Sequence, residues 1–228
     1  MKLFLDIADT AVVAQNFTAG VIDGVTTNPT LIKKSGRDPH DVYKDLIKIG
    51  LSDISMEVVG TVAEMIEEGY NLVNHFGYEN CTIKLPLTRD GLIACKELSG
   101  ANIRTNLTLV FSVEQAVLAA KAGATYVSPF VGRLDDIGVD GIGLISDIKS
   151  AFVLGGFETE ILSASIRTVD KVMASFVAGA DIVTMPPSIL DEMYQHDLTD
   201  KGLEIFDADW AAVSHSEFEK EDCEECDS

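Results

Sequence analysis

With 228 residues, 46% hydrophobic and 24% charged, the chain has the composition of a globular protein, which excludes a disordered or collagen-like polymer. Its formal net charge of -20 argues against nucleic acid and anionic membrane as partners, because both carry negative charge themselves. No apolar stretch approaches the ~20 residues that a bilayer span requires, and Asp6 interrupts the N-terminal apolar run too early for a signal peptide, so we expect a cytoplasmic protein.

Short β-type runs alternate with amphipathic helical stretches along the chain. The expected strands are residues 2–7, 24–27, 54–59, 82–87, 104–109, 126–131, 160–166 and 181–185. The expected helices include residues 62–76, 90–98, 113–122, 144–154, 169–178 and 189–194. Gly123 and Gly179 each stand between two alanines, at the position of a left-handed helix C-cap before the next strand.

This order of elements predicts a single α/β domain. Repeated strand–helix units imply right-handed parallel crossovers, and eight units close into a (β/α)8 TIM barrel more naturally than they extend an open sheet. No Gly-x-Gly-x-x-Gly motif follows the first strand, which disfavours a dinucleotide-binding fold. We expect the barrel domain to cover residues 1–213 and to end in an extra amphipathic helix at 199–213, suited to cover the barrel or a neighbouring subunit.

The last residues, 214–228, are strongly acidic, with seven carboxylates against one lysine. Such a segment with almost no apolar anchors is typical of a flexible, solvated tail. Cys223 and Cys226 lie in it with Cys-x-x-Cys spacing, but the alternative of a redox or metal pair is weak, since only His215 is near. The other two cysteines are Cys81 and Cys95, and a chain of this size needs no disulfide framework, which fits a reducing compartment.

Polar residues gather late in the expected strands, where TIM barrels carry their active sites. In chain order they are Asp6, Thr26, Asn28, Glu57, Lys84, Asn106, Thr108, Ser128 and Ser165. So many polar side chains facing one axis are difficult to explain by packing alone. We therefore expect them to form one site.

Lys84 stands among apolar neighbours in the run Thr-Ile-Lys-Leu-Pro-Leu at residues 82–87. Burial favours the neutral amine, which is the form that attacks a ketone to give a Schiff base. Two structural alternatives stay open: a lysine that reaches water from a strand end, or one half of a buried ion pair with Glu57 or Asp6. The same carboxylates suit Schiff-base chemistry, which needs groups to move protons on and off the substrate hydroxyl and to help water leave the carbinolamine.

Histidine placement argues against other chemistries. None of the four lies at a strand end, so neither a zinc site nor a serine or cysteine triad is expected; they are His40, His75, His196 and His215.

Two arginines follow strands six and seven, where barrels frequently bind phosphate. Arg133 and Arg167 hold these positions, and arginine binds a phosphate dianion bidentately. We therefore expect a phosphorylated substrate. The alternative for either arginine is a surface salt bridge, for example from Arg133 to Asp135 or Asp136.

Six segments together resemble the transaldolase family in its short form. They are Phe4-Leu-Asp6, Gly24-Val-Thr-Thr-Asn-Pro-Thr30, Ile83-Lys84-Leu-Pro, Asn106-Leu-Thr108-Leu, Tyr126-Val-Ser-Pro-Phe-Val-Gly-Arg133 and Ala164-Ser165-Ile-Arg167. The resemblance runs in order from residue 2 to about 213 and leaves only the acidic tail outside. It implies an enzyme of the pentose phosphate pathway without metal or organic cofactor. Such an enzyme transfers a dihydroxyacetone unit from sedoheptulose 7-phosphate or fructose 6-phosphate to glyceraldehyde 3-phosphate or erythrose 4-phosphate.

The resemblance also implies roles for individual residues. Lys84 resembles the Schiff-base lysine and Asp6 the acid/base of carbon–carbon cleavage. Glu57, with Thr108 and a water, resembles the proton relay for Schiff-base formation. The other matched residues resemble the substrate site: Asn28, Asn106 and Ser128 for the dihydroxyacetone hydroxyls, Arg133, Ser165 and Arg167 for the phosphate, with Thr26 and Phe130 beside them. Short members of the family form pentameric rings that pair into decamers, so we expect a homo-oligomer.

Fructose-6-phosphate aldolase belongs to the same family and is the alternative enzyme. It carries glutamine where this chain has Glu57 and tyrosine where this chain has Phe130. A tyrosine hydroxyl can activate the water that protonates the enamine and frees dihydroxyacetone, whereas a phenyl ring cannot. Phe130 therefore favours transfer to an acceptor. A non-catalytic scaffold barrel would be marked by loss of Lys84 or Asp6, and both are present.

Overall fold

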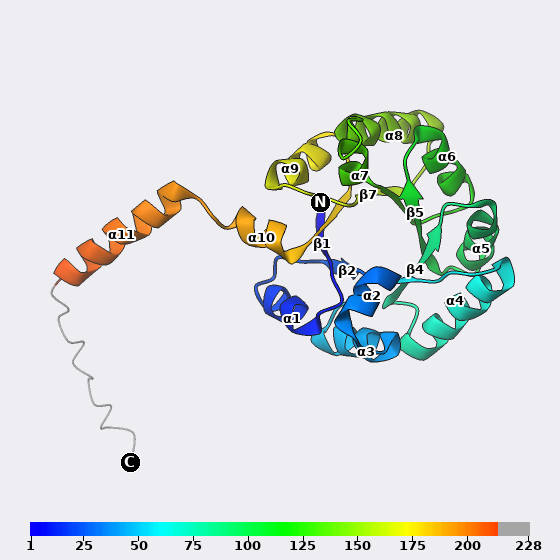
Figure 1. Cartoon of the computed structure of the whole chain (residues 1–228), viewed down its shortest axis with the longest axis horizontal. Helices are drawn as coiled ribbons and strands as arrows, with labels where there is room; N and C mark the ends of the chain where they lie inside the picture. The colour runs from blue at the N-terminus through cyan, green and yellow to red at the C-terminus, as the bar shows by residue number, and fades with distance from the viewer. Residues whose placement is uncertain (214–228) are drawn as a thin grey trace, which may run out of the picture. The chain divides into compact units, whose positions relative to one another are not determined.

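Eight parallel strands close into a barrel in the computed structural model, which describes residues 1–213 (Figure 1). Each strand pairs with the next along the chain, and β1 pairs with β8. The strands are β1 (Lys2–Asp6), β2 (Gly24–Thr26), β3 (Ile54–Glu57), β4 (Cys81–Pro86), β5 (Arg104–Val110), β6 (Tyr126–Pro129), β7 (Glu160–Ser163) and β8 (Ile182–Met185). The expected TIM barrel is confirmed.

Helices alternate with the strands and surround them in Figure 1. They are α1 (Thr10–Thr18), α2 (Pro29–Ser35), α3 (Pro39–Ile49), α4 (Val62–Phe76), α5 (Arg89–Gly100), α6 (Val113–Lys121), α7 (Val131–Asp135), α8 (Gly141–Gly155), α9 (Val169–Val177) and α10 (Pro187–Met193). The barrel forms a compact unit, Met1–Met193. A second unit begins at Tyr194 and contains α11 (Asp197–Ala212), close to the expected terminal helix. Among the described residues, no helix combines the length and the apolar character needed to cross a membrane.

The apolar pattern predicts strands six and seven too long. β6 ends at Pro129 and not at residue 131, because α7 begins at Val131. β7 ends at Ser163, and Ser165 has a φ of 60°, which no extended strand allows. The prediction that Ser165 lies within strand seven was therefore wrong.

Four helices were not among those named from the pattern: α1, α2, α3 and α7. Two of them carry a clear local start signal. Asn28 and Asp38 cap α2 and α3 through their side chains, and a proline follows each cap at the first helical position. Proline is favoured there, because its missing N–H would have no partner in the first turn.

The interior of the barrel holds an apolar layer of its own. Phe4, Tyr126, Leu162 and Ile182, all nearly or fully buried, form a cluster separate from the larger core between strands and helices. Gly24 makes room for this layer, since a Cβ at that position would lie 2.6 Å from Cζ of Phe4.

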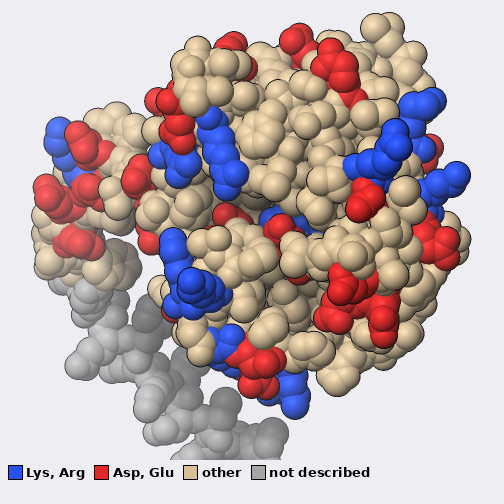
Figure 2. Space-filling model, turned by 45° about the vertical axis from the view of Figure 1, so that its right-hand side comes forward, with Lys and Arg blue, Asp and Glu red and all other residues tan. Residues whose placement is uncertain are grey.

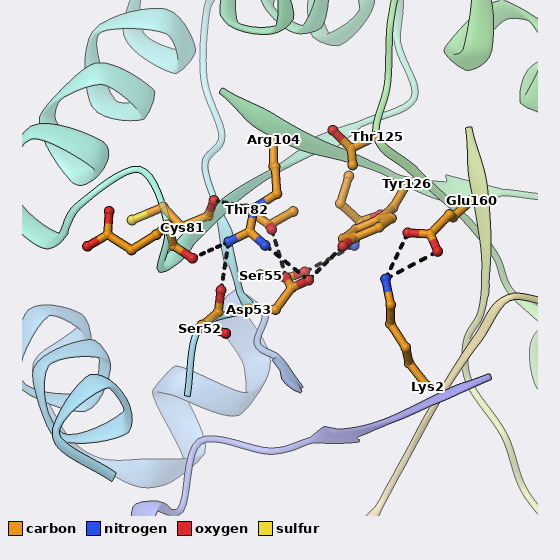
Figure 3. Close-up of polar contacts among 12 residues, drawn as sticks. Lys2, Ser52, Asp53, Ser55, Cys81, Thr82, Arg104, Thr125, Tyr126 and Glu160 are labelled. Atoms are coloured by element: carbon orange, nitrogen blue, oxygen red, sulfur yellow. Dashed lines mark hydrogen bonds and ion pairs between the residues drawn. The ribbon is translucent and has the colours of Figure 1, made fainter. Parts of the chain in front are cut away.

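A polar network lies at the N-terminal ends of the strands (Figure 3). Asp53 accepts hydrogen bonds from Thr82 Oγ1 at 2.8 Å and from the Tyr126 hydroxyl at 2.6 Å, and Arg104 forms an ion pair with it at 3.3 Å. Burial, together with the negative charge of Asp53, raises the pKa of Tyr126, which keeps the phenol a neutral donor. These paired groups fill one end of the barrel and leave the other for the site.

Candidate active site

A cavity of about 490 Å³ opens at the C-terminal ends of the strands. Figure 2 shows acidic and basic side chains together in the hollow of the barrel face and further basic side chains at its rim. Eleven of the twelve predicted site residues line the cavity: Asp6, Thr26, Asn28, Glu57, Lys84, Thr108, Ser128, Phe130, Arg133, Ser165 and Arg167. The twelfth, Asn106, is fully buried; its amide accepts from Ser128 Oγ at 2.7 Å and donates to Ser55 Oγ at 3.2 Å.

Lys84 and Glu57 lie side by side on β4 and β3, where the register pairs them directly. The Lys84 ammonium is 3.0 Å from Glu57 Oε2 and donates to the Thr27 carbonyl at 3.0 Å. The ion pair with Glu57, which the sequence left open as an alternative, is therefore present. The same geometry puts Glu57 within reach to take a proton from the amine, so the pair is compatible with catalysis as well.

Asp6 ends β1 and takes part in a short chain of hydroxyl groups. Its Oδ1 accepts a hydrogen bond from Thr26 Oγ1 at 2.8 Å, and Thr26 Oγ1 lies 2.7 Å from Thr184 Oγ1. Burial raises the pKa of Asp6, while the positive charge of Lys84 and the bond from Thr26 oppose the rise. A carboxyl group with a raised pKa is suited to both accept and return a proton during turnover.

Thr108 is buried on β5, and its hydroxyl is the one buried side-chain oxygen or nitrogen without a protein partner in residues 1–213. It lines the cavity together with the next residue, Leu109, although neighbours in a regular strand face opposite sides. A shift of register between Leu107 and Val110 explains this, since Leu109 has a φ of 62° and forms a bulge. Leu109 was missed from the sequence, because nothing in Thr-Leu-Val indicates a bulge.

The guanidinium group of Arg133 stacks on Phe130, with Cζ 4.8 Å from the ring centroid. The surface ion pair suggested for Arg133 is not formed. Asp136 pairs with Arg167 at 3.1 Å, and Asp135 pairs with Lys171 at 3.0 Å. Among residues 1–213, Arg133 thus has no acidic partner and is available to an anion.

Ser165 and α7 meet closely at the same side of the cavity. A Cβ at Gly132 would lie 1.9 Å from the Ser165 carbonyl oxygen and 2.8 Å from Arg167 Cγ. Only glycine fits there. This contact brings Arg133 of α7 together with Ser165 and Arg167, which follow β7, as a phosphate site requires.

Other cavity residues lie at positions that were not predicted from the expected strand ends. Helix α2 contributes Thr30, Leu31 and Lys34, and β8 contributes Thr184. Asn28 followed by proline was the sequence signal that could have predicted helix α2 and so its place beside β2. In residues 1–213, no group of three or more histidine, cysteine, aspartate and glutamate side chains is arranged to bind a metal ion. His215, Cys223 and Cys226 lie outside the described residues.

Comparison with known proteins places the chain in a family. The Transaldolase/Fructose-6-phosphate aldolase model matches residues 3–225. The chain belongs to this family. The match extends beyond residue 213, so the prediction that the acidic tail lies outside the resemblance was wrong.

Relatives cover almost the whole chain. A protein from Caulobacter vibrioides named "Probable transaldolase" is 52% identical over 217 residues, which is 95% of this chain and 99% of the relative. Proteins of the same name from Dinoroseobacter shibae and Ruegeria sp. are 52% and 51% identical, over 92% and 93% of this chain and 96% and 98% of their own length. The description of the family names both a transaldolase and a fructose-6-phosphate aldolase, so membership by itself does not decide between these two activities.

Proposed function

We propose that this protein is a transaldolase that forms a Schiff base on Lys84 and moves a dihydroxyacetone unit between sugar phosphates. The donor would be sedoheptulose 7-phosphate or fructose 6-phosphate, and the acceptor glyceraldehyde 3-phosphate or erythrose 4-phosphate. The observation that supports it most is a buried lysine that pairs with Glu57 and interacts with Asp6, in a cavity that also holds Arg133 and Arg167.

The first step joins the donor to the enzyme. Glu57 takes a proton from Lys84, and the freed amine attacks the ketone carbon of the donor to give a carbinolamine. Return of a proton to the carbinolamine hydroxyl releases water and leaves the Schiff base. Thr108, whose hydroxyl has no protein partner in residues 1–213, is suited to orient the water that exchanges these protons with Glu57.

The second step divides the sugar. Asp6 takes the proton of the C4 hydroxyl, the C3–C4 bond breaks, and its electron pair moves into the Schiff base to give an enamine on Lys84. The phosphorylated aldehyde leaves. An acceptor aldehyde then follows the reverse path: the enamine carbon attacks it, and Asp6 returns the proton to the new hydroxyl.

Phe130 favours transfer over release. Its ring contacts Phe111, at 5.8 Å between centroids, and the Arg133 guanidinium, and a phenyl ring has no hydroxyl that could deliver a proton to the enamine. Fructose-6-phosphate aldolase activity is the second candidate, because the fold and the lysine are shared. Glu57 and Phe130 both argue against it.

A coupled assay with fructose 6-phosphate, run with and without erythrose 4-phosphate, tests the proposal. We expect rapid turnover only with the acceptor and little free dihydroxyacetone without it. Release as fast as transfer would favour the aldolase. Phe130→Tyr should raise release, since a positioned proton donor is typically worth about 10²- to 10⁴-fold. Phe111→Tyr is the matched control, because Phe111 touches Phe130 but is not a cavity residue.

The remaining expectations rest on family resemblance. We propose a cytoplasmic homo-oligomer, pentameric or decameric, that acts in the pentose phosphate pathway without metal or organic cofactor. Residues 214–228, for which the sequence predicts a flexible tail, lie outside the described residues.

A further inference from the structure

Helix α2 forms one wall of the cavity. Its residues Thr30, Leu31 and Lys34 all line the space, and positions three and four apart share one face of a helix. The helix starts directly after β2, where Asn28 accepts a hydrogen bond from the Leu31 amide at 2.9 Å. The cap fixes the first turn at the cavity, and the helical spacing then directs Lys34 toward the same space.

Within residues 1–213, the Lys34 side chain has no charged partner. It forms no ion pair or hydrogen bond there, whereas Arg37 and Lys48 both pair with Asp45. Arg133 is the other cavity cation without a carboxylate in this part of the chain. Other lysines of the described chain also have no partner, but Lys34 lines the cavity beside Arg133 and is therefore suited to bind an external anion.

The charges at the cavity point to the kind of anion. Four basic and two acidic side chains line it, and Asp136 pairs with Arg167 from outside the lining, which leaves a net charge of +1; the lining charges are Lys34, Lys84, Arg133 and Arg167 against Asp6 and Glu57. A phosphate monoester carries a charge close to -2 at neutral pH. Without Lys34 the net charge would be zero, and the dianion would find no excess of positive charge.

We propose that Lys34 binds the phosphate group of the sugar phosphate as a third cation beside Arg133 and Arg167, and so sets the preference for phosphorylated over unphosphorylated aldehydes. The inference rests on the proposed function and concerns the same cavity. Lysine acts on phosphate as a point charge on a flexible stem. Its contribution is the same in the ground state and the transition state, so it lowers KM and leaves kcat unchanged.

Two neighbouring lysines provide the test. Lys33 and Lys34 both lie in the last turn of α2, and both are exposed, but only Lys34 lines the cavity. Lys33→Gln and Lys34→Gln therefore change the net charge and the helix terminus equally. For each variant, kcat and KM are measured with erythrose 4-phosphate and with erythrose, at saturating fructose 6-phosphate. Competitive inhibition by inorganic phosphate is measured as well.

We expect Lys34→Gln to raise KM for erythrose 4-phosphate about 3- to 10-fold and to weaken inhibition by phosphate by a similar factor. This is the loss in affinity expected when one partly exposed ion pair with a doubly charged group is removed. Kinetics with erythrose should not change, Lys33→Gln should resemble the wild type, and Lys34→Arg should restore most of the affinity. Equal effects of the two glutamine variants, or an equal loss with erythrose, would overturn the role of Lys34.

The experiments distinguish a failure of the transaldolase proposal from a failure of the proposal about Lys34. A wild-type protein that releases dihydroxyacetone without an acceptor contradicts the transaldolase assignment, yet KM for fructose 6-phosphate and phosphate inhibition still compare Lys34→Gln with Lys33→Gln. Unchanged values in both measurements would overturn the inference about Lys34 whichever reaction the enzyme catalyses.

Discussion

Two buried threonines on neighbouring strands offer a test of how the site affects stability. Thr82 on β4 and Thr108 on β5 are 0% and 1% exposed. Thr82 Oγ1 donates to Asp53 at 2.8 Å, while the Thr108 hydroxyl has no protein partner in residues 1–213. Valine has nearly the shape of threonine, so Thr→Val at each position changes one hydroxyl into a methyl group and little else.

The two substitutions should change stability by different amounts. The Thr108 hydroxyl faces the cavity and makes no bond within residues 1–213, so Thr108→Val should leave the free energy of unfolding nearly unchanged. A hydrogen bond to a charged group contributes about 1.5–3 kcal/mol, and Thr82→Val removes such a bond from Asp53. The variants should differ by at least about 1 kcal/mol, or roughly 2 °C or more in Tm for a domain of this size.

Urea unfolding followed by circular dichroism measures both values, and the transfer assay is run on the same samples. We expect Thr108→Val to be as stable as the wild type and much less active, because the hydroxyl faces the cavity. If Thr108→Val is as destabilising as Thr82→Val, the Thr108 hydroxyl stabilises the fold, and its assignment to the reaction is refuted.

Three further substitutions test individual parts of the structure. Lys84→Met should abolish the borohydride-trapped adduct with fructose 6-phosphate in mass spectrometry while the protein stays folded, because methionine keeps the volume without the amine; a trapped variant would place the nucleophile elsewhere. Thr26→Val removes a hydrogen bond that lowers the Asp6 pKa, so that pKa rises further. Asp6 must lose its proton to act as a base, and the acid limb of the kcat/KM profile should therefore move to higher pH; an unmoved limb would contradict the role of Asp6. Asp53→Ala leaves Arg104 without its carboxylate at the far end of the barrel, and denaturant unfolding should show a loss of about 3 kcal/mol or more. The kcat of the folded fraction should not change, and a loss below about 1 kcal/mol would show that the network is not structural.

The sequence alone determined the barrel, because the signals for its elements are local. Helix α4 has both predicted ends, Val62 and Phe76, since Thr61 and Glu64 form a capping box and Gly77 follows the last turn. The ends of β6 and β7 could not be predicted in this way. The apolar run continues past each strand into α7 or into the turn at Ser165, and hydrophobicity carries no information about where the backbone changes direction.

Most of the site was also predictable, because the C-terminal ends of parallel strands meet at one end of a barrel. Tertiary structure alone decided which charges are paired and which are free. Arg167 pairs with Asp136, 31 residues away in sequence, so Arg133 has no acidic partner in residues 1–213 and can bind an anion. Helix α2 brings Lys34 to the same cavity. The bulge in β5 that lets both Thr108 and Leu109 line the cavity likewise depends on the pairing of β5 with β6 in the barrel. Pairings of this kind depend on distances between segments far apart in the chain, which no local pattern of residues encodes.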